Sequence, residues 1–214
     1  MNCCQCQGIE DLFSETYVAG ELAQYRAHGP DKTTRMLINA LKSTDVQGLT
    51  LLDIGGGLGA IQHDMLRAGV EQATLVEASS AYLAAAKAEA ERRGNAEQIN
   101  FQHGDFVDLA PQVPSADIVT LDRVICCYHD MQRLVGLSVG KAGRLYGLVY
   151  PRDTWWIKLG LAIQNFFFRL MRRQYRSFAH STKAVEALVY GEGFTRRFHR
   201  QTFAWQVVVY ARPN

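Results

Sequence analysis

The first two thirds of the chain alternate short apolar runs with longer stretches in which apolar residues recur every three or four positions. Short apolar runs are typical of buried strands, and the longer periodic stretches are typical of helices. The pattern predicts strands at residues 49–54, 72–78, 99–105, 116–124 and 143–151, with helices at 59–69, 81–94 and 131–142 between them. Strands separated by helices form βαβ units with right-handed crossovers, so we expect a parallel sheet.

The two ends of the chain depart from this alternation. Two helices, at residues 9–29 and 31–44, are predicted before the first strand. Pro30 and Asp31 suit the first turn of the second of these helices. Residues 193–212 contain two strand-like segments with only a short connection between them. A connection that short joins antiparallel strands, so we expect a hairpin at the edge of the sheet.

The composition is that of an ordinary globular domain. The chain has 214 residues, of which 48% are apolar and 21% are charged. This length leaves room for one domain with a substantial core. No apolar run reaches the roughly 20 residues that cross a bilayer, and the first residues lack the features of a signal peptide. We therefore expect a cytoplasmic protein.

The cysteines indicate reduced thiols rather than a disulfide framework. They are Cys3, Cys4, Cys6, Cys126 and Cys127. Three sulfurs as close together as those of "CCQC" cannot easily surround a zinc ion without a further ligand. We expect a thiol-rich terminus without a metal, and a role in handling metals or thiols is the alternative.

The net charge of +2 conceals an asymmetry. Residues 1–150 carry 12 Lys and Arg against 18 Asp and Glu, whereas residues 151–214 carry 11 against 3. A basic region on an otherwise acidic protein suggests an anionic partner, such as a lipid headgroup, a carboxylate substrate or nucleic acid. A solvated basic face without a partner is the alternative.

The segment "TLLDIGGGLGAIQ" places three consecutive glycines directly after the first predicted strand. A glycine-rich turn between a strand and a helix brings backbone N–H groups close to a ligand. Gly55, Gly57 and Ala60 satisfy the G-x-G-x-x-A pattern of dinucleotide sites, but the carboxylate of Asp53 would repel a pyrophosphate. The pattern D-x-G-x-G-x-G, from Asp53 to Gly59, resembles motif I of the class I S-adenosylmethionine-dependent methyltransferases. Their cofactor has an ammonium group and no phosphate.

The resemblance implies a set of cofactor contacts at the ends of the strands. Glu77 is expected to accept hydrogen bonds from both ribose hydroxyls, and Asp105 and Phe106 are expected beside the adenine. Asp122 is expected beside the substrate cleft, and Arg26 is expected to pair with the methionine carboxylate. The implied cofactor-binding residues are Arg26, Asp53, Gly55, Gly56, Gly57, Gly59, Glu77, Ala78, Asp105, Phe106 and Asp122.

The resemblance also implies the fold and its organisation. We expect an α/β, Rossmann-like class I methyltransferase fold: a seven-stranded, mostly parallel sheet with an antiparallel C-terminal hairpin strand. Residues 1–214 would form a single methyltransferase domain. Within it, residues 1–45 would be an N-terminal helical cap, and residues 152–180 a hydrophobic and basic lid insertion of the kind this family often has after the fifth strand.

Methyl transfer from a sulfonium requires alignment of the acceptor and exclusion of water, and a base only if the acceptor must lose a proton. The catalytic candidates lie in "LDRVICCYHD". His129 is the candidate general base, because an imidazole can take a proton from a hydroxyl or thiol near neutral pH, and Asp122 and Tyr128 could orient the substrate. Cys126 and Cys127 are expected to be small apolar fillers. Oxygen is the first expectation for the accepting atom, and sulfur and nitrogen are the alternatives.

Residues 151–176 have an amphipathic pattern. At 100° per residue, Lys158 and Arg169 fall on a basic stripe, with aromatic and aliphatic residues on the other side. This pattern is typical of a helix in a membrane interface or over a hydrophobic substrate, and packing on the core is the alternative. We expect a small hydrophobic substrate and peripheral membrane contact through residues 155–176. No nucleic acid is expected, because "LDRVICC" lacks the N/D-P-P-Y/F signature.

Within the superfamily, the segment "RAHGPDKTTRMLINAL" and the hydrophobic region after the fifth strand are similar to those of magnesium-protoporphyrin O-methyltransferase-like proteins. The sequence thus predicts an enzyme that methylates a small hydrophobic molecule. A cofactor-binding module that attaches to a membrane or partner without catalysis is the alternative from another class.

Overall fold

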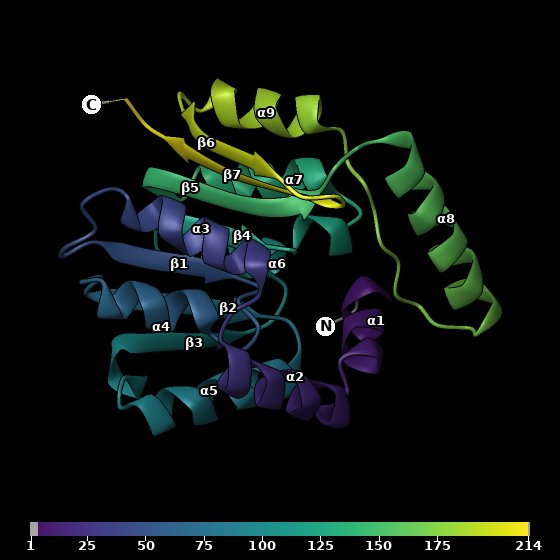
Figure 1. Cartoon of the computed structure of the whole chain (residues 1–214), viewed down its shortest axis with the longest axis horizontal. Coiled ribbons are helices and arrows are strands. Elements are labelled where there is room, and N and C mark those ends of the chain that lie inside the picture. The colour runs from purple at the N-terminus through teal and green to yellow at the C-terminus, as the bar shows by residue number, and fades with distance from the viewer. Residues whose placement is uncertain (1–3, 214) are drawn as a thin grey trace.

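A computed structural model of the chain describes residues 4–213 (Figure 1). The side chains of residues 1–7 lie outside this description, and with them Cys3, Cys4 and Cys6. The expectation of a metal-free, thiol-rich terminus therefore stays a prediction.

The centre of the molecule is one seven-stranded sheet in the order β3-β2-β1-β4-β5-β7-β6. The strands are β1 (Thr50–Ile54), β2 (Gln72–Glu77), β3 (Ile99–His103), β4 (Ala116–Asp122), β5 (Ala142–Pro151), β6 (Thr195–Gln201) and β7 (Trp205–Ala211). The first five pair in parallel, and β7 pairs antiparallel with both β5 and β6. The predicted fold class is confirmed, including the antiparallel hairpin at the edge.

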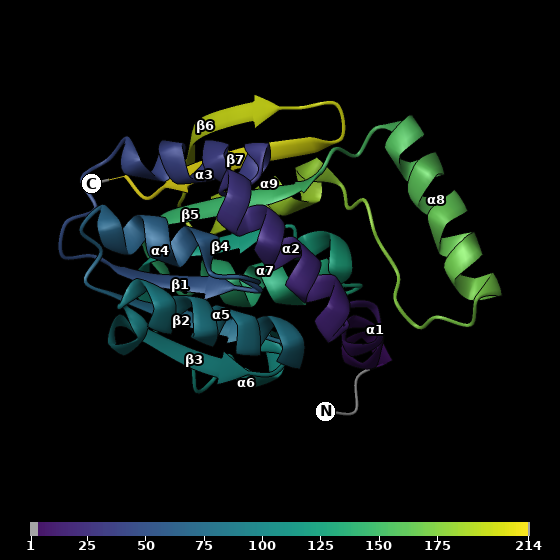
Figure 2. The ribbon, with the colours of Figure 1, turned by 60° about the horizontal axis from the view of Figure 1, so that its bottom comes forward.

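Helices cover both faces of the sheet (Figures 1 and 2). They are α1 (Cys4–Leu12), α2 (Glu15–His28), α3 (Lys32–Lys42), α4 (Ala60–Arg67), α5 (Ser80–Arg93), α6 (Phe106–Leu109), α7 (Met131–Val139), α8 (Trp155–Leu170) and α9 (Thr182–Gly191). Buried residues of α3, α4 and α5 form one core with the sheet, and those of α6, α7 and α9 form a second core on the other face.

Three local differences from the predicted elements have physical causes. The helix expected at 9–29 is two helices, because Ser14 adopts an extended conformation and its hydroxyl caps α2 by accepting from the Tyr17 N–H at 3.4 Å. Strand β4 ends before Arg123, whose φ of 61° is incompatible with a strand. Helix α9 was not predicted; Val185 and Val189 bury its inner side against the second core.

Helix α8 lies within the segment 151–176 but is shorter than the predicted pattern. It ends at Leu170, and Arg172 (φ 55°) turns the chain into an extended return segment, residues 171–180. Figures 1 and 2 show α8 standing apart from the sheet. None of its residues is buried, so the alternative of packing on the core is wrong.

Helix α2 is anchored by a buried carboxylate. Glu89 of α5 is fully buried and accepts hydrogen bonds from Arg26 at 2.9 Å, Arg92 at 2.6 Å and Arg93 at 2.7 Å. These bonds, led by the one from Arg92, hold the pKa of Glu89 well below its usual range. Of these three donors only Arg26 belongs to α2, so the Arg26–Glu89 bond ties α2 to α5 and adds to the burial of Val18 and Tyr25.

We expect Glu89→Gln to lower the free energy of unfolding by about 2 kcal/mol, since charge-assisted hydrogen bonds are lost from a buried site. Urea denaturation measures the change, and hydrogen exchange should show faster exchange in α2. Glu91→Gln on the exposed side of α5 is the control. Equal stability of both variants would show that the cluster does not anchor α2.

Candidate active site

A cavity of about 640 Å³ lies at the carboxyl ends of β1, β2 and β4. Ile54, Val76 and Asp122, near the ends of these strands, are part of its wall. The strand order reverses between β1 and β4, and open α/β sheets bind ligands at such a switch point. The volume is in the range of sites for small molecules and cofactors.

The floor of the cavity is the glycine turn between β1 and α4. Gly55 adopts a φ of 63°, and a Cβ there would lie 2.5 Å from a methyl carbon of Val124. At Gly56 a Cβ would meet the Asp53 carboxylate at 2.3 Å. Side chains are therefore excluded at Gly55 and Gly56, and the backbone of the turn borders the cavity through Gly55, Gly56 and Gly57.

Glu77, the last residue of β2, ties this turn to the neighbouring strand. One carboxylate oxygen accepts from the Gly57 N–H at 3.0 Å, and the other accepts from the Ser79 N–H at 2.9 Å. Burial raises the pKa of Glu77, while the backbone donors oppose that change. Glu77 and the adjacent Ala78 both line the cavity.

Asp53 lies behind the turn, outside the cavity wall. Its side chain is fully buried and accepts from the Thr120 hydroxyl at 2.6 Å and from the Gln62 amide at 2.8 Å. Burial raises its pKa to about 7. The structure therefore corrects the expectation that Asp53 faces the cationic ligand: it supports the turn from below. Gly59 is also absent from the wall, and begins α4 instead.

Asp105 and Phe106 form the wall beyond β3. One oxygen of Asp105 caps α6 by accepting from the Val107 N–H at 2.9 Å. The other oxygen accepts from the Tyr128 hydroxyl at 2.9 Å, so two loops that follow different strands meet here. The carboxylate, the ring of Phe106 and Tyr128 thus line one part of the cavity, although β2 and β1 separate β3 from β4 in the sheet.

A polar cluster surrounds the end of β4. Asp122 accepts from the Thr34 hydroxyl, and Arg123 forms ion pairs with both Asp122 and Asp31. Burial raises the pKa of Asp122, and the Arg123 guanidinium opposes that change. Arg123 holds a left-handed backbone conformation, which is rare for a side chain of its size. Sequence reasoning missed Arg123 and Asp31, although both stand beside residues that it selected.

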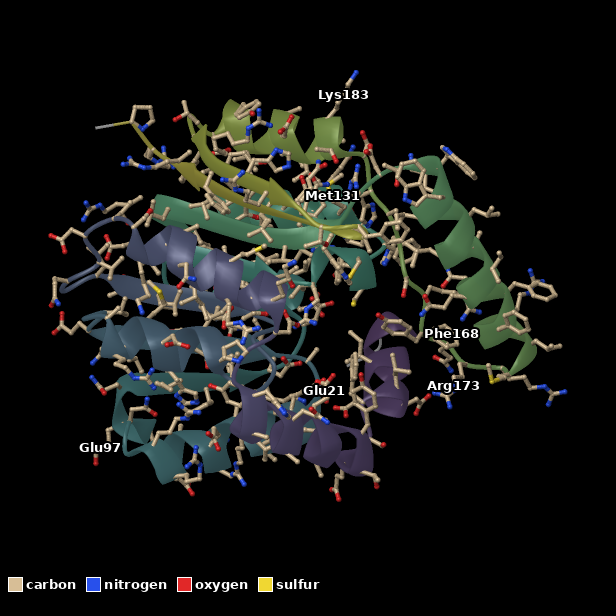
Figure 3. All side chains as sticks on the ribbon, viewed as in Figure 1. Glu21, Glu97, Met131, Phe168, Arg173 and Lys183 are labelled. Carbon is tan, nitrogen blue, oxygen red and sulfur yellow. The ribbon has the colours of Figure 1, made fainter. Side chains whose placement is uncertain are left out.

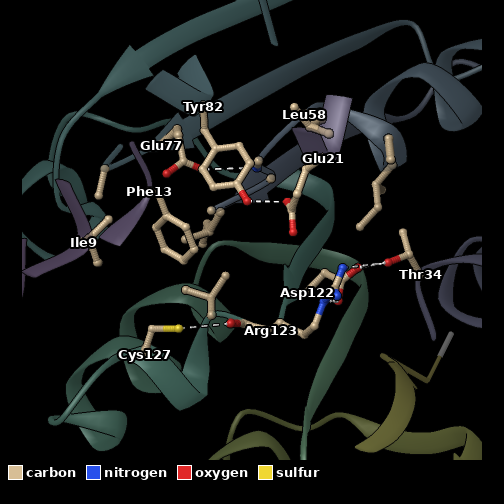
Figure 4. A pocket seen from close by; sticks show the side chains of 18 of the residues that line it. Ile9, Phe13, Glu21, Thr34, Leu58, Glu77, Tyr82, Asp122, Arg123 and Cys127 are labelled. Carbon is tan, nitrogen blue, oxygen red and sulfur yellow. Dashed lines mark hydrogen bonds and ion pairs between the residues drawn. The ribbon is translucent and has the colours of Figure 1, made fainter. Parts of the chain in front are cut away.

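The helical cap closes the cavity from the side of α1 and α2 (Figure 4). Most wall residues of these helices and of the turn between them recur about every four positions: Ile9, Phe13, Tyr17, Glu21, Tyr25 and His28, with Gln24 beside them. Glu21 accepts hydrogen bonds from the hydroxyls of Tyr17 and of Tyr82 on α5. Figure 3 labels Glu21, which lies about halfway along α2, where this helix comes close to α1. The sequence suggests a place at the cleft for His28 but not for the other cap residues, because nothing in α2 signals which of its sides faces a ligand.

Two other predicted residues lie away from the cavity. Arg26 binds Glu89, as described above, and does not line the cavity, so the methionine carboxylate cannot be assigned to it in this structure. His129 is exposed, and its ring stacks on Tyr128 with the centroids 5.5 Å apart. Cys126 and Cys127 both line the wall; the Cys127 sulfur lies 2.9 Å from the Tyr175 hydroxyl.

Comparison with known proteins defines the class. Residues 5–138 match the O-methyltransferase domain family, which is more than half of the chain, so the chain belongs to this family. It is an S-adenosylmethionine-dependent methyltransferase, and the predicted family and cofactor are confirmed. No curated protein sequence matches it.

Solved structures support the fold. The chain is similar to magnesium protoporphyrin IX methyltransferase from Synechocystis PCC 6803 with bound SAH: 18% identity, TM-score 0.71, 98% of this chain and 100% of that chain covered. The same enzyme with bound SAM gives 15% identity and a TM-score of 0.70, with 98% of this chain and 97% of that chain covered. A putative sarcosine dimethylglycine methyltransferase from Galdieria sulphuraria gives 13% identity and a TM-score of 0.66, with 85% of each chain covered. The predicted likeness to the magnesium-protoporphyrin enzymes is found again at the level of the fold.

The position of Asp53 makes a prediction about pH. Its pKa rises from 3.8 to about 7 on folding, so the folded state binds the extra proton between these values, and stability falls as pH rises through this window. We expect Asp53→Asn to remove this decrease in the free energy of unfolding, which amounts to about 1 kcal/mol per pH unit. Urea denaturation from pH 5 to pH 8 measures it.

Asp108→Asn, at an exposed position, is the matched control and should keep the wild-type pH dependence. Parallel pH profiles for wild type and Asp53→Asn would show that Asp53 does not retain a proton in the folded state.

Proposed function

We propose that this methyltransferase transfers the methyl group of S-adenosylmethionine to an oxygen atom of a small hydrophobic acceptor. The observation that carries the proposal is the single cavity wall that joins an acidic strand edge to an aromatic cap. Glu77, Asp105 and Asp122 lie at the strand edge, and Phe13 and Tyr175 lie at the aromatic side. The acidic edge suits a cationic nucleoside, and the aromatic side suits an apolar acceptor.

At the cofactor end, we assign the ribose hydroxyls to Glu77 and the adenine to Asp105 and Phe106. The backbone of the glycine turn and Ala78 would lie along the remainder of the nucleoside. The cations of the described wall are Arg35 and Arg123, so we assign the methionine carboxylate to one of these instead of Arg26. This assignment follows the family's arrangement wherever the cavity allows it.

At the acceptor end, the chain has to align the acceptor atom with the methyl group and keep water away. Asp122 is the candidate base, because its raised pKa suits a group that takes a proton from a hydroxyl. Tyr128 lines the same wall and would orient the acceptor. His129 stacks on the side of Tyr128 and is assigned a supporting position rather than the base itself.

Oxygen is preferred as the accepting atom because the matching family is described as an O-methyltransferase domain. We further propose peripheral membrane contact through residues 155–176, on the cytoplasmic side, as a route to a hydrophobic acceptor. None of the described helices is both long and apolar enough to cross a bilayer. Within residues 152–180 only Tyr175 lines the cavity, so the proposed lid would act through that residue.

The test is methyl transfer from labelled S-adenosylmethionine to a set of porphyrin, quinone, phenol and thiol acceptors. We expect label in a hydrophobic acceptor with a free hydroxyl or carboxyl group. Asp122→Asn should lower kcat about 100-fold, the usual contribution of a general base, while cofactor affinity stays within a few-fold.

Asp108→Asn is the matched control and should keep full activity. Label found only in the thiol would contradict oxygen as the accepting atom. Full activity of Asp122→Asn would remove Asp122 as the base, and binding of the cofactor shows in each case that the variant is folded.

A further inference from the structure

One side of α8 is a continuous apolar surface that nothing in the described chain covers. Of the twelve large hydrophobic side chains exposed in the described residues, eight lie between Trp155 and Met171. Trp155 is 72% exposed, Phe166 63% and Leu170 70%. A patch of this kind on a folded protein marks a site of interaction.

The exposure results from the way α8 is fixed to the protein. The residues of α8 that are half-buried recur along one edge: Ile157, Leu161, Asn165 and Phe168. The Asn165 amide donates to the Ser177 carbonyl at 2.8 Å and its oxygen accepts from the Ser177 N–H at 2.9 Å. The return segment thus holds this edge, and at 100° per residue most of the large apolar side chains point away from it.

The tip of the β6–β7 hairpin extends this surface. Phe203 at the tip is 79% exposed. The Arg152 guanidinium donates to the carbonyl oxygens of Thr202 and Phe203, at 3.3 and 3.4 Å, and lies 5.7 Å from the ring centre of Trp156. The hairpin tip and the first turn of α8 are therefore joined through one arginine.

The charges beside this surface identify its partner. No acidic residue occurs between Asp153 and Glu186, whereas the same stretch contains Lys158, Arg169, Arg172, Arg173, Arg176 and Lys183. A second copy of the chain bound through the same face would set these cations against one another. A nucleic acid would leave the tryptophan, phenylalanine and leucine side chains without a suitable contact. An anionic bilayer satisfies both the cations and the apolar side chains.

We propose that the outer side of α8, together with Phe203 of the hairpin tip, is a docking surface for a bilayer that contains anionic lipid. Trp155 and Trp156 enter the interfacial layer, where tryptophan is enriched. The neighbouring Lys and Arg side chains meet the headgroups of the anionic lipid and are attracted by their negative charge. The docking proposal thus names anionic lipid as the lipid class and adds the hairpin tip to the membrane contact proposed for residues 155–176.

Docking there leaves α8 between the bilayer and the segment that contributes Tyr175 to the cavity wall. The ring of Phe168 on α8 lies 5.8 Å from that of Tyr175, and Tyr175 belongs to the cavity wall. A hydrophobic acceptor could pass from the bilayer to the cavity along this path, and this inference rests on the proposed function. The docking itself does not.

Co-sedimentation of the full chain with vesicles tests the docking. We expect binding to phosphatidylcholine vesicles that contain phosphatidylglycerol and at least tenfold weaker binding to phosphatidylcholine alone. Phe166→Ser, Leu170→Ser and Phe203→Ser combined should weaken binding at least tenfold. Arg169→Glu with Arg173→Glu should do the same for the anionic vesicles.

The matched control is Leu137→Ser with Tyr190→Ser, two exposed apolar residues on α7 and α9, which should bind vesicles as the wild type does. Equal binding by all variants, or no binding to either vesicle, overturns the proposal. So does a wild-type dimer that the apolar variant dissociates while neither binds lipid. Because the assay contains no acceptor, a failure of methyl transfer leaves its result unchanged.

Discussion

The hydrogen bond from the Gly57 N–H to the Glu77 carboxylate is the interaction on which the site depends. It fixes the glycine turn after β1 to the end of β2, two strands that are adjacent in the sheet. Because Gly55, Gly56 and Gly57 have no side chains, the backbone comes close to the cavity. Without the carboxylate, the turn would keep only the hydrogen bond from the Gly55 N–H to the Val76 carbonyl, at 2.7 Å, as a link to β2. In the proposed assignment the same carboxylate also binds the ribose, so that one residue would both shape the site and bind within it.

The remaining acids of the site follow from the same geometry. In a parallel sheet the carboxyl ends of the strands lie on one edge, so residues as distant in the sequence as Glu77, Asp105 and Asp122 share one wall. This is why these three could be predicted without knowledge of any contact. The parallel pairing of the first five strands and the antiparallel terminal hairpin were predictable from the chain itself, because connection length decides between parallel and antiparallel pairing.

What could not be predicted depends on packing between distant elements. Asp53 has the sequence position of a ligand-facing acid, yet it is turned under Gly56, where Thr120 and Gln62 satisfy it. The sequence predicts Arg26 beside the cofactor, but in the structure its side chain donates to the buried Glu89 instead. The partners Thr120, Gln62 and Glu89 lie elsewhere in the sequence. The spacing of apolar and polar residues therefore cannot show that these contacts turn Asp53 and Arg26 away from the ligand.

The helices α8 and α9 are both amphipathic, but they use their apolar sides differently. In α9 the apolar residues bury themselves against the sheet, and in α8 similar residues face outward because the return segment holds only a narrow edge of the helix. Sequence periodicity shows that an apolar side exists. The tertiary structure decides whether it belongs to the core or to a partner.

Calorimetric titration of S-adenosylmethionine into wild type and Glu77→Gln tests the central claim most directly. The account predicts one-to-one binding and at least tenfold lower affinity in the variant, because charge-assisted hydrogen bonds are lost at the ribose. Glu71→Gln, at an exposed position on the connection before β2, should bind as the wild type does. Unchanged affinity in a folded Glu77→Gln variant, or binding of a nicotinamide dinucleotide in place of S-adenosylmethionine, would contradict the account.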